Sequence, residues 1–191
     1  MKGMEKMSKI ILASQSPRRK ELLSLLNIEY EAIPADIEEY IDSSNDLVKE
    51  IEKLSYQKAF HIFKDNKDAL VIGADTIVKI DNEVLGKPKT YEDAKRMLQS
   101  LSNNTHEVVT GVTILKDDKV ETFSSIAKIT FYSLTDEEID EYIKTNEPMD
   151  KAGAYAIQGI GAKFIKTIDG DYYTIMGLPI AELYHRIQKY L

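Results

Sequence analysis

An aspartate interrupts the most apolar stretch of the chain. Residues 69–80 read ALVIGADTIVKI, and Asp75, followed by Thr76, separates two apolar runs. A carboxylate in a strand otherwise suited to burial costs free energy unless it is paired or binds a metal. Acids at such positions in α/β clefts hold Mg²⁺ or act as general bases. The residues leave open a second interpretation, in which the strand ends at Ala74 and Asp75 begins a turn.

A turn rich in hydroxyl and guanidinium groups follows the first apolar run. Ser14, Ser16, Arg18 and Arg19 lie in the segment SQSPRR, where Ser16 and Pro17 are typical of a helix start. A helix N-terminus offers free backbone N–H groups and the positive end of the helix dipole, and both favour anions. Because positive charge in a first turn opposes the dipole, the arginines favour an anion site over a plain helix cap with solvated arginines.

Two lysines occupy positions from which they could reach an anion. Lys58 falls four residues after Leu54 and four before Ile62, on the apolar stripe of an expected helix. Such a lysine usually extends its ammonium to solvent, but it could instead point along the interior. Lys87 lies in the turn LGKP soon after Asp75, and a turn lysine is usually solvated.

A glycine-rich segment covers residues 147–161, EPMDKAGAYAIQGIG. Glycine lets a ligand approach the backbone closely, and the segment also carries the pair Asp150 and Lys151. The amide of Gln158 has the donor and the acceptor needed to read a base edge. A tight reverse turn between strands would also explain the glycines.

Three acids, Asp36, Glu38 and Glu39, precede the expected long helix. An acidic loop is usually solvated surface. Only a partner such as Asp75 would make one of these carboxylates a metal ligand.

The composition excludes several classes of protein. The 191 residues contain 25 basic and 32 acidic side chains, a net charge of −7, which argues against a nucleic-acid polymer or an anionic membrane as partner. The absence of cysteine excludes disulfides, thiolate metal sites and a cysteine nucleophile, and the three separated histidines disfavour zinc. The apolar run 10–13 is too short for a signal peptide, and no segment reaches the length of a membrane span. We therefore expect a soluble cytoplasmic protein in which residues 1–8 form a loose extension.

Helical and strand patterns alternate around these residues. Helices are expected at 17–26, 46–63, 90–101, 135–144 and from Pro179 to the end, and strands at 9–13, 28–33, 69–80, 83–85, 105–115, 119–132, 164–168 and 172–175. The last two strands are expected to pair through a turn at Asp169 and Gly170. Alternating elements with hairpins predict one α/β domain over residues 1–191, with a mixed twisted sheet flanked by helices.

The motifs together resemble the Maf family of nucleoside triphosphate pyrophosphatases, historically labelled septum-formation inhibitors. The resemblance is collinear from Ile10 to about Leu183. It rests on ILASQSPRRKELL, the acidic turn ending at Glu39, the helix with Lys58, GADTIV, LGKP, HEVVTGV, EPMDKAGAYAIQG and GDYYTIMGLP. The resemblance implies an ITPase-like fold with an elongated cleft, a nucleoside triphosphate substrate and a possible homodimer.

The resemblance also implies a reaction and roles for named residues. The expected reaction is hydrolysis of the triphosphate to the monophosphate and pyrophosphate, dependent on a divalent cation such as Mg²⁺ or Mn²⁺. Asp75 matches the proton acceptor, and Glu39 matches an acid that could hold the metal with Asp75. The remaining matches are the substrate-choice positions Arg18, Thr76 and Gln158 and the phosphate-contact positions Ser14, Ser16, Lys58, Lys87 and Lys151.

The loop GAYAIQG, with Arg18 and Thr76, resembles the subgroup that acts on dTTP and UTP. Two residues depart from the family pattern: Ala156 replaces the glycine of GAYGIQG, and Asn103 replaces a glycine after LS. The Ala156 methyl group is expected to lie near Gln158 and could narrow the base pocket. The alternatives are a non-catalytic regulator of cell division that acts through a protein partner and a house-cleaning enzyme for deaminated purine nucleotides.

Overall fold

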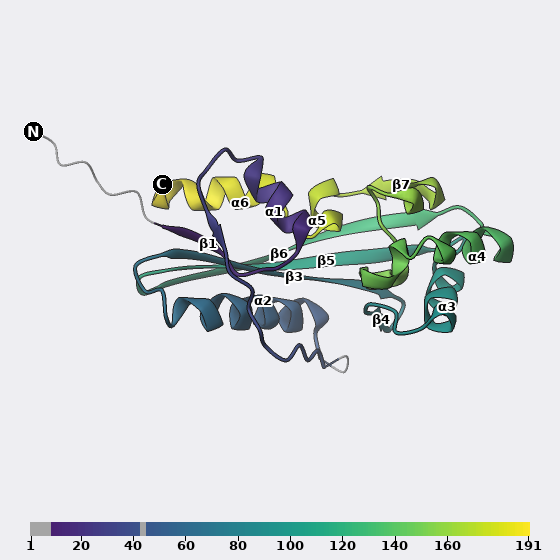
Figure 1. The fold of residues 1–191 in the computed structure, drawn as a ribbon, viewed down its shortest axis with the longest axis horizontal. Helices are drawn as coiled ribbons and strands as arrows, with labels where there is room; N and C mark the ends of the chain where they lie inside the picture. The colour runs from purple at the N-terminus through teal and green to yellow at the C-terminus, as the bar shows by residue number, and fades with distance from the viewer. Residues whose placement is uncertain (1–8, 43–44) are drawn as a thin grey trace, which may run out of the picture.

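A seven-stranded mixed sheet forms the centre of the computed structural model, which describes residues 9–42 and 45–191 (Figure 1). The strand order is β2-β1-β3-β5-β6-β7, and β4 also pairs with β3. The strands are β1 (Ile10–Leu12), β2 (Glu31–Ala32), β3 (Leu70–Ile80), β4 (Glu83–Leu85), β5 (Thr105–Lys116), β6 (Lys119–Phe131) and β7 (Ile165–Asp169). The helices are α1 (Pro17–Ser24), α2 (Leu47–Phe63), α3 (Tyr91–Leu101), α4 (Asp136–Lys144), α5 (Tyr172–Met176) and α6 (Ile180–Ile187). The mixed sheet flanked by helices that the sequence predicted is confirmed.

Strand β3 has different neighbours along its two edges. Antiparallel β5 pairs with it over nearly its whole length. On the other edge, parallel β1 pairs only as far as Ile72, and antiparallel β4 pairs only from Val78 onward. Among the described strands, none pairs with this edge between Ile72 and Val78. Asp75 and Thr76 lie in that interval, so the sheet itself leaves an opening beside them.

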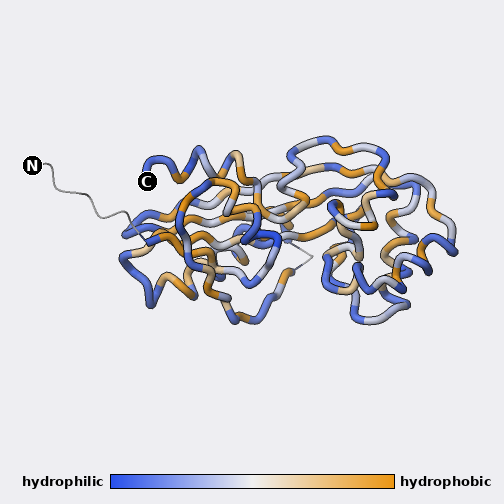
Figure 2. Tube along the Cα trace, turned by 45° about the horizontal axis from the view of Figure 1, so that its top comes forward, coloured by the Kyte–Doolittle hydropathy of each residue, from blue (hydrophilic) through white to orange (hydrophobic). Residues whose placement is uncertain are grey.

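Helices cover the two halves of the sheet differently (Figure 1). At the end near β1, α1, α5 and α6 lie on one face, and α2 lies on the other. At the opposite end, α3, α4 and the segment 152–164 pack around a second core that includes Leu98, Phe131 and Tyr142. Figure 2 shows hydrophobic residues recurring along the central strands and the inner sides of the helices. Strands β3, β5 and β6 run through both cores.

Two glycines let α2 lie directly against the sheet. A Cβ atom on Gly73 would come 2.4 Å from the Ser55 carbonyl oxygen and 2.6 Å from the Ala59 nitrogen. A Cβ atom on Gly111, in the adjacent strand, would come 2.7 Å from the Ile51 carbonyl oxygen. This contact fixes the height of α2 over β3, and with it the position of the side chains that α2 directs toward Asp75.

One predicted element is wrong. Residues 172–175 do not form a strand that pairs with the preceding one, because Tyr172–Met176 is the helix α5. Its N-terminus is capped by Asp171, whose carboxylate accepts the backbone N–H groups of Tyr173 and Thr174. Strand β7 pairs with β6 instead. The cap outweighs the strand propensity of the sequence Tyr-Tyr-Thr-Ile.

Other predicted elements are confirmed, some with shorter bounds. The strands β3 and β4, and β5 and β6, pair as antiparallel hairpins, and Asp46 caps α2. Thr135 and Glu138 form a capping box at the start of α4. Strand β2 contains only Glu31–Ala32, and α6 ends at Ile187 with a 3₁₀ turn after it. The expected loose extension, residues 1–8, lies outside the described residues. No helix in the described part of the chain is long and apolar enough to cross a membrane.

Candidate active site

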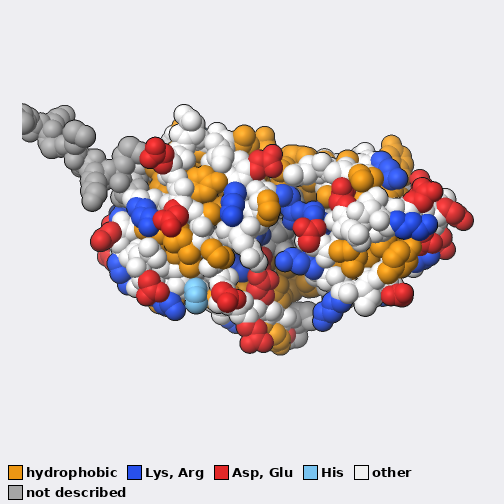
Figure 3. All heavy atoms as spheres, viewed as in Figure 1, with side chains coloured by type: hydrophobic (Ala, Val, Ile, Leu, Met, Phe, Trp, Pro, Cys, Tyr) orange, Lys and Arg blue, Asp and Glu red, His pale blue; other side chains and the backbone are white. Residues whose placement is uncertain are grey.

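A cavity of about 1140 Å³ opens beside the unpaired edge of β3. Its walls come from both halves of the sheet: the β1–α1 turn and α2 on one side, and β4 with the segment 150–158 on the other. Figure 3 shows this face hollowed at its centre, with Lys and Arg side chains on both sides of the hollow. All ten residues that the sequence analysis assigned to the site border the cavity.

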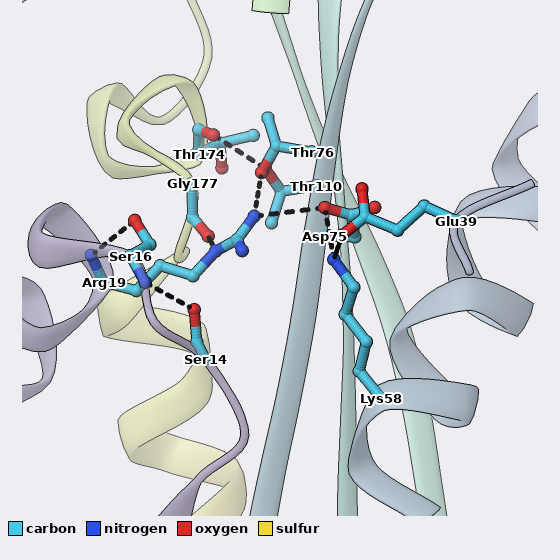
Figure 4. A network of polar contacts seen from close by, with 10 residues as sticks. All are labelled: Ser14, Ser16, Arg19, Glu39, Lys58, Asp75, Thr76, Thr110, Thr174 and Gly177. Carbon is cyan, nitrogen blue, oxygen red and sulfur yellow. Dashed lines mark hydrogen bonds and ion pairs between the residues drawn. The ribbon is translucent and has the colours of Figure 1, made fainter. Parts of the chain in front are cut away.

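Asp75 lies between two cations, one on each side of β3 (Figure 4). Its Oδ1 is 3.1 Å from Lys58 Nζ on α2 and 3.5 Å from Arg19 Nη2 on α1. Strand β3 continues through this position, so Asp75 is an acid within a strand and does not begin a turn. Lys58 is buried, with 6% of its surface exposed. Its ammonium therefore points inward to the carboxylate and does not extend to solvent.

Lys58 also contacts a second carboxylate. Its Nζ lies 2.6 Å from Glu39 Oε1, on the loop between β2 and α2 (Figure 4). One buried ammonium thus brings Glu39 and Asp75 together, as the sequence analysis required for a shared metal. Asp36 and Glu38, the other two acids that the sequence analysis named there, do not border the cavity.

Thr76 faces the opposite side of the sheet from Asp75, because successive strand residues alternate between faces. Its Oγ1 accepts a hydrogen bond from Arg19 Nη2 at 3.0 Å and lies 2.8 Å from Thr110 Oγ1 on β5. Thr110 in turn donates to the Thr174 carbonyl of α5. Arg19 Nε donates to the Gly177 carbonyl at 2.8 Å. The Arg19 guanidinium therefore joins α1, β3 and the turn after α5.

The two arginines of SQSPRR have different surroundings. Both border the cavity and are half-buried, but Arg19 bonds Thr76 and Gly177, whereas Arg18 lies beside Asp150. Burial lowers the pKa of Arg18, with a smaller contribution from Arg19, while Asp150 opposes the shift. Ser16 caps α1, and Ser14 accepts the Ser16 N–H. The helix start thus places two arginines at the cavity and commits Arg19 to hydrogen bonds within the protein.

Lys87 and Lys151 lie on the opposite wall. The Gly153 N–H donates to the Gly86 carbonyl at 3.1 Å and so joins the turn that carries Lys87 to the segment that carries Lys151. Lys151 pairs with Asp150. Lys87 is exposed at the cavity rim. Cationic side chains from four separate segments therefore surround the space in front of Asp75.

Gln158 borders the cavity and is exposed, while the neighbouring Ala156 and Ile157 are buried. Ala156 has a negative φ, so alanine replaces the family glycine without backbone strain. Asn103 has φ +52°, a left-handed conformation that glycine and asparagine tolerate best. Both departures from the family pattern are thus compatible with the local backbone.

Comparison with known proteins identifies the family. Residues 9–190 of the chain match the protein family Maf, described as "Maf-like protein". The chain belongs to the Maf family. A "dTTP/UTP pyrophosphatase" of Bacillus cytotoxicus is 48% identical over 184 residues, which cover 96% of each chain. A Bacillus cereus protein with the same name is 48% identical over 186 residues, covering 97% of this chain and 92% of its own. The solved Ham1 protein of Staphylococcus aureus superposes with a TM-score of 0.44 at 14% identity, covering 64% of this chain and 71% of that one.

The donor groups of this Maf chain are compatible with a divalent cation. Within residues 9–42 and 45–191, no three His, Asp or Glu side chains form a metal cluster. Mg²⁺, however, is usually held by one or two carboxylates together with substrate phosphates, and it does not need a complete protein cage. Glu39 and Asp75, which share Lys58, supply such a pair at the cavity.

Sequence reasoning did not separate the role of Arg19 from that of Arg18 in this Maf chain. The partner that distinguishes them, Gly177, is 158 residues away along the chain. The sequence analysis also missed His106, whose Nε2 lies 2.8 Å from the hydroxyl of Tyr155 on the cavity wall. The position of this histidine within the apolar strand motif HEVVTGV could have indicated that it is buried and needs a polar partner.

Proposed function

We propose that this Maf protein hydrolyses dTTP and UTP to the nucleoside monophosphate and pyrophosphate. The observation that carries the proposal is the position of Asp75, a carboxylate between Lys58 and Arg19 on the floor of a cavity rimmed by cations. The substrate assignment is supported by the relatives named dTTP/UTP pyrophosphatase, which match almost the whole chain.

Asp75 is the proposed general base. Its carboxylate accepts a proton from a water molecule whose oxygen attacks the α-phosphorus. The bond between the α-phosphorus and the bridging oxygen of the β-phosphate breaks, and pyrophosphate leaves with the bonding electrons. Lys58 and Arg19 both contact Oδ1 of this carboxylate, from opposite sides of the strand, and would hold it in place at the cavity.

The cations of the rim are the proposed phosphate ligands. Arg18, Lys87 and Lys151 would bind the triphosphate and stabilise the charge that develops on the leaving pyrophosphate. The hydroxyls of Ser14 and Ser16 lie on the same wall as Arg18. A divalent cation held by Glu39 and Asp75 would supply further neutralisation of the phosphate charge.

Base selection is assigned to Gln158, on the 150–158 wall of the cavity. The Gln158 amide can donate to one carbonyl oxygen of thymine or uracil and accept from its N3–H. Thr76 and Arg18 border the same cavity and complete the proposed selectivity set. The purine-specific alternative predicts instead that ITP and XTP are the better substrates.

A single substrate panel tests the proposal. Pyrophosphate release is measured from dTTP, UTP, CTP, ATP, GTP, ITP and XTP, each with Mg²⁺ and with Mn²⁺. We expect the highest kcat/KM for dTTP and UTP, and loss of turnover in a folded Asp75→Asn protein. No turnover of any nucleotide would instead favour the non-catalytic regulator, and preference for ITP would favour the deaminated-purine enzyme.

A further inference from the structure

A carboxylate outside the cavity holds the glycine-rich loop in shape. Glu147 Oε2 accepts the Ile160 N–H at 2.9 Å, and its Oε1 accepts the Gly161 N–H at 3.0 Å. The Tyr142 hydroxyl donates to the same Oε1 at 2.8 Å. Burial alone would raise the pKa of Glu147, but these three donors and the charge of Lys151 outweigh it and lower the pKa below its ordinary value. Glu147 is therefore held as an ionised acceptor for two backbone groups of the loop.

Tyr142 extends this contact to the beginning of the loop. Its side chain is buried, with 1% exposed, and its ring packs edge-on against Phe164 at 5.1 Å between centroids. The hydroxyl that donates to Glu147 also accepts the Ala156 N–H at 3.1 Å. The two side chains thus fix three backbone N–H groups, two residues before Gln158 and two and three residues after it.

The fit around Glu147 leaves no room for a side chain at position 159. A Cβ atom on Gly159 would lie 2.3 Å from Glu147 Oε2 and 2.5 Å from its carboxyl carbon. The loop therefore closes directly onto the carboxylate, and Gln158 is the exposed residue between its anchored ends. The Glu147 side chain does not border the cavity, and its hydrogen bonds join it to the loop and to Tyr142. Lys151, on the cavity wall, donates to the backbone carbonyl of Glu147 at 3.5 Å, a contact that a change of the Glu147 side chain leaves in place.

We propose that Glu147 and Tyr142 are positioning residues for nucleobase recognition, and that they act by holding the 156–161 loop so that Gln158 faces the base. This inference rests on the proposed function, in which Gln158 reads the base. Neither side chain has a part in holding the triphosphate or in the attack on the α-phosphorus.

The proposal predicts a separation between binding and turnover. In Glu147→Gln, the amide presents a donor where the carboxylate accepted one, so at least one N–H of the loop loses its partner. In Tyr142→Phe, the hydroxyl that joins Ala156 to Glu147 is lost while the ring is kept. In both variants we expect KM for dTTP to rise by about fivefold or more with kcat nearly unchanged, because one lost hydrogen bond corresponds to roughly that factor.

Inorganic tripolyphosphate distinguishes base recognition from phosphate binding. It lacks a base, and it competes only for the phosphate ligands. Its inhibition constant is therefore expected to stay the same in wild type, Glu147→Gln and Tyr142→Phe. A parallel rise of that constant with KM for dTTP would overturn the proposal, as would a fall in kcat at constant KM.

Matched controls come from the same part of the fold. Glu141→Gln alters an exposed acid on α4, and Tyr132→Phe removes the hydroxyl of an exposed tyrosine next to β6. Both controls should keep the wild-type KM for dTTP. Thermal unfolding of each variant reports how much stability is lost, and a rise in KM confined to the Glu147 and Tyr142 variants supports positioning.

Amide hydrogen exchange tests the anchor independently of any activity. The Ile160 and Gly161 N–H groups should be protected in the wild-type protein and exchange at least about fivefold faster in Glu147→Gln. Rapid exchange of both groups in the wild type would overturn the anchor even if dTTP is a substrate. If the wild-type protein releases no pyrophosphate from dTTP or UTP, the proposed function fails. The anchor would still be supported in that case if the Ile160 and Gly161 N–H groups are protected in the wild type and lose their protection in Glu147→Gln.

Discussion

His106 on β5 is a buried base whose protonation should oppose folding. It is 1% exposed, and its ring packs edge-on against Phe131 and Tyr155. Its Nε2 lies 2.8 Å from the Tyr155 hydroxyl, while Nδ1 has no hydrogen-bond partner among the described residues. An imidazolium needs acceptors for both N–H groups, and the site offers at most one. Burial accordingly lowers the pKa of His106 from 6.5 to about 4.

The sign and size of the effect follow from that pKa. Between pH 6.5 and 4, an unfolded His106 binds a proton that the folded protein excludes, so the free energy of unfolding falls as pH falls through this window. The stability is fully present above pH 6.5. The pKa shift corresponds to a loss of about 3 kcal/mol in the free energy of unfolding once the pH is below 4. About 2 kcal/mol of this should already be lost at pH 5.

Urea unfolding of wild type and His106→Gln at pH 7 and pH 5 measures this contribution. Glutamine does not titrate, so the variant is expected to be less stable at pH 7 but to lose about 2 kcal/mol less than wild type on going to pH 5. The carboxylates titrate in both proteins and cancel in the difference. His185→Gln, at an exposed position on α6, is the control and should follow wild type. Equal losses in wild type and His106→Gln would refute the argument that His106 is buried in its neutral form.

Three further substitutions test the site and the packing that supports it. Asp75→Asn should lower kcat for dTTP by about 10²–10⁴-fold with unchanged circular dichroism, and near-normal turnover would remove Asp75 from the role of base. Arg18→Ala should lower kcat/KM by at least about tenfold if Arg18 binds phosphate in a bidentate manner. An unchanged kcat/KM would show that Arg18 does not bind the substrate. Gly73→Ala should destabilise the protein by about 1–3 kcal/mol in urea unfolding, because its methyl group would push α2 from the sheet. A Gly73→Ala protein of wild-type stability would show that α2 can move freely.

The sequence located the chemical groups of the site better than their partners. Asp75 was predicted because a carboxylate within an apolar run needs a partner, and Lys58 because it interrupts an apolar helical stripe. Both signals are local, and the structure brings the two side chains within 3.1 Å. The sequence analysis could not decide whether Asp75 ended its strand, since the pairing with β5 that continues β3 comes from residues more than 30 positions later.

The contacts that the sequence did not reveal depend on tertiary placement. The sequence predicts the same role, at an anion site, for Arg18 and Arg19, because no local feature distinguishes two adjacent arginines at a helix start. The commitment of Arg19 to Gly177 depends on where α5 lies, and α5 was itself mistaken for a strand. The Asp171 cap was a local signal that could have corrected that error. The Glu147 anchor was also hidden, because its donors lie 13 and 14 residues further along the chain.

The unpaired stretch of β3 has a mechanical consequence. The β1–α1 wall is attached to the first half of this strand and the β4 wall to the second, while the ladder with β5 continues without interruption behind them. The two walls are therefore not joined by a flexible linker, as the walls of a cleft between two independent domains would be. Widening the cavity requires bending a hydrogen-bonded sheet. Under the proposed function, differences between nucleotides would be accommodated by the rims: the turn 14–19, the loop that carries Glu39 and the segment 150–158. The protein thus combines a stiff frame with adjustable rims: Asp75 is fixed within the sheet, whereas Gln158, the residue proposed to read the base, lies on a rim.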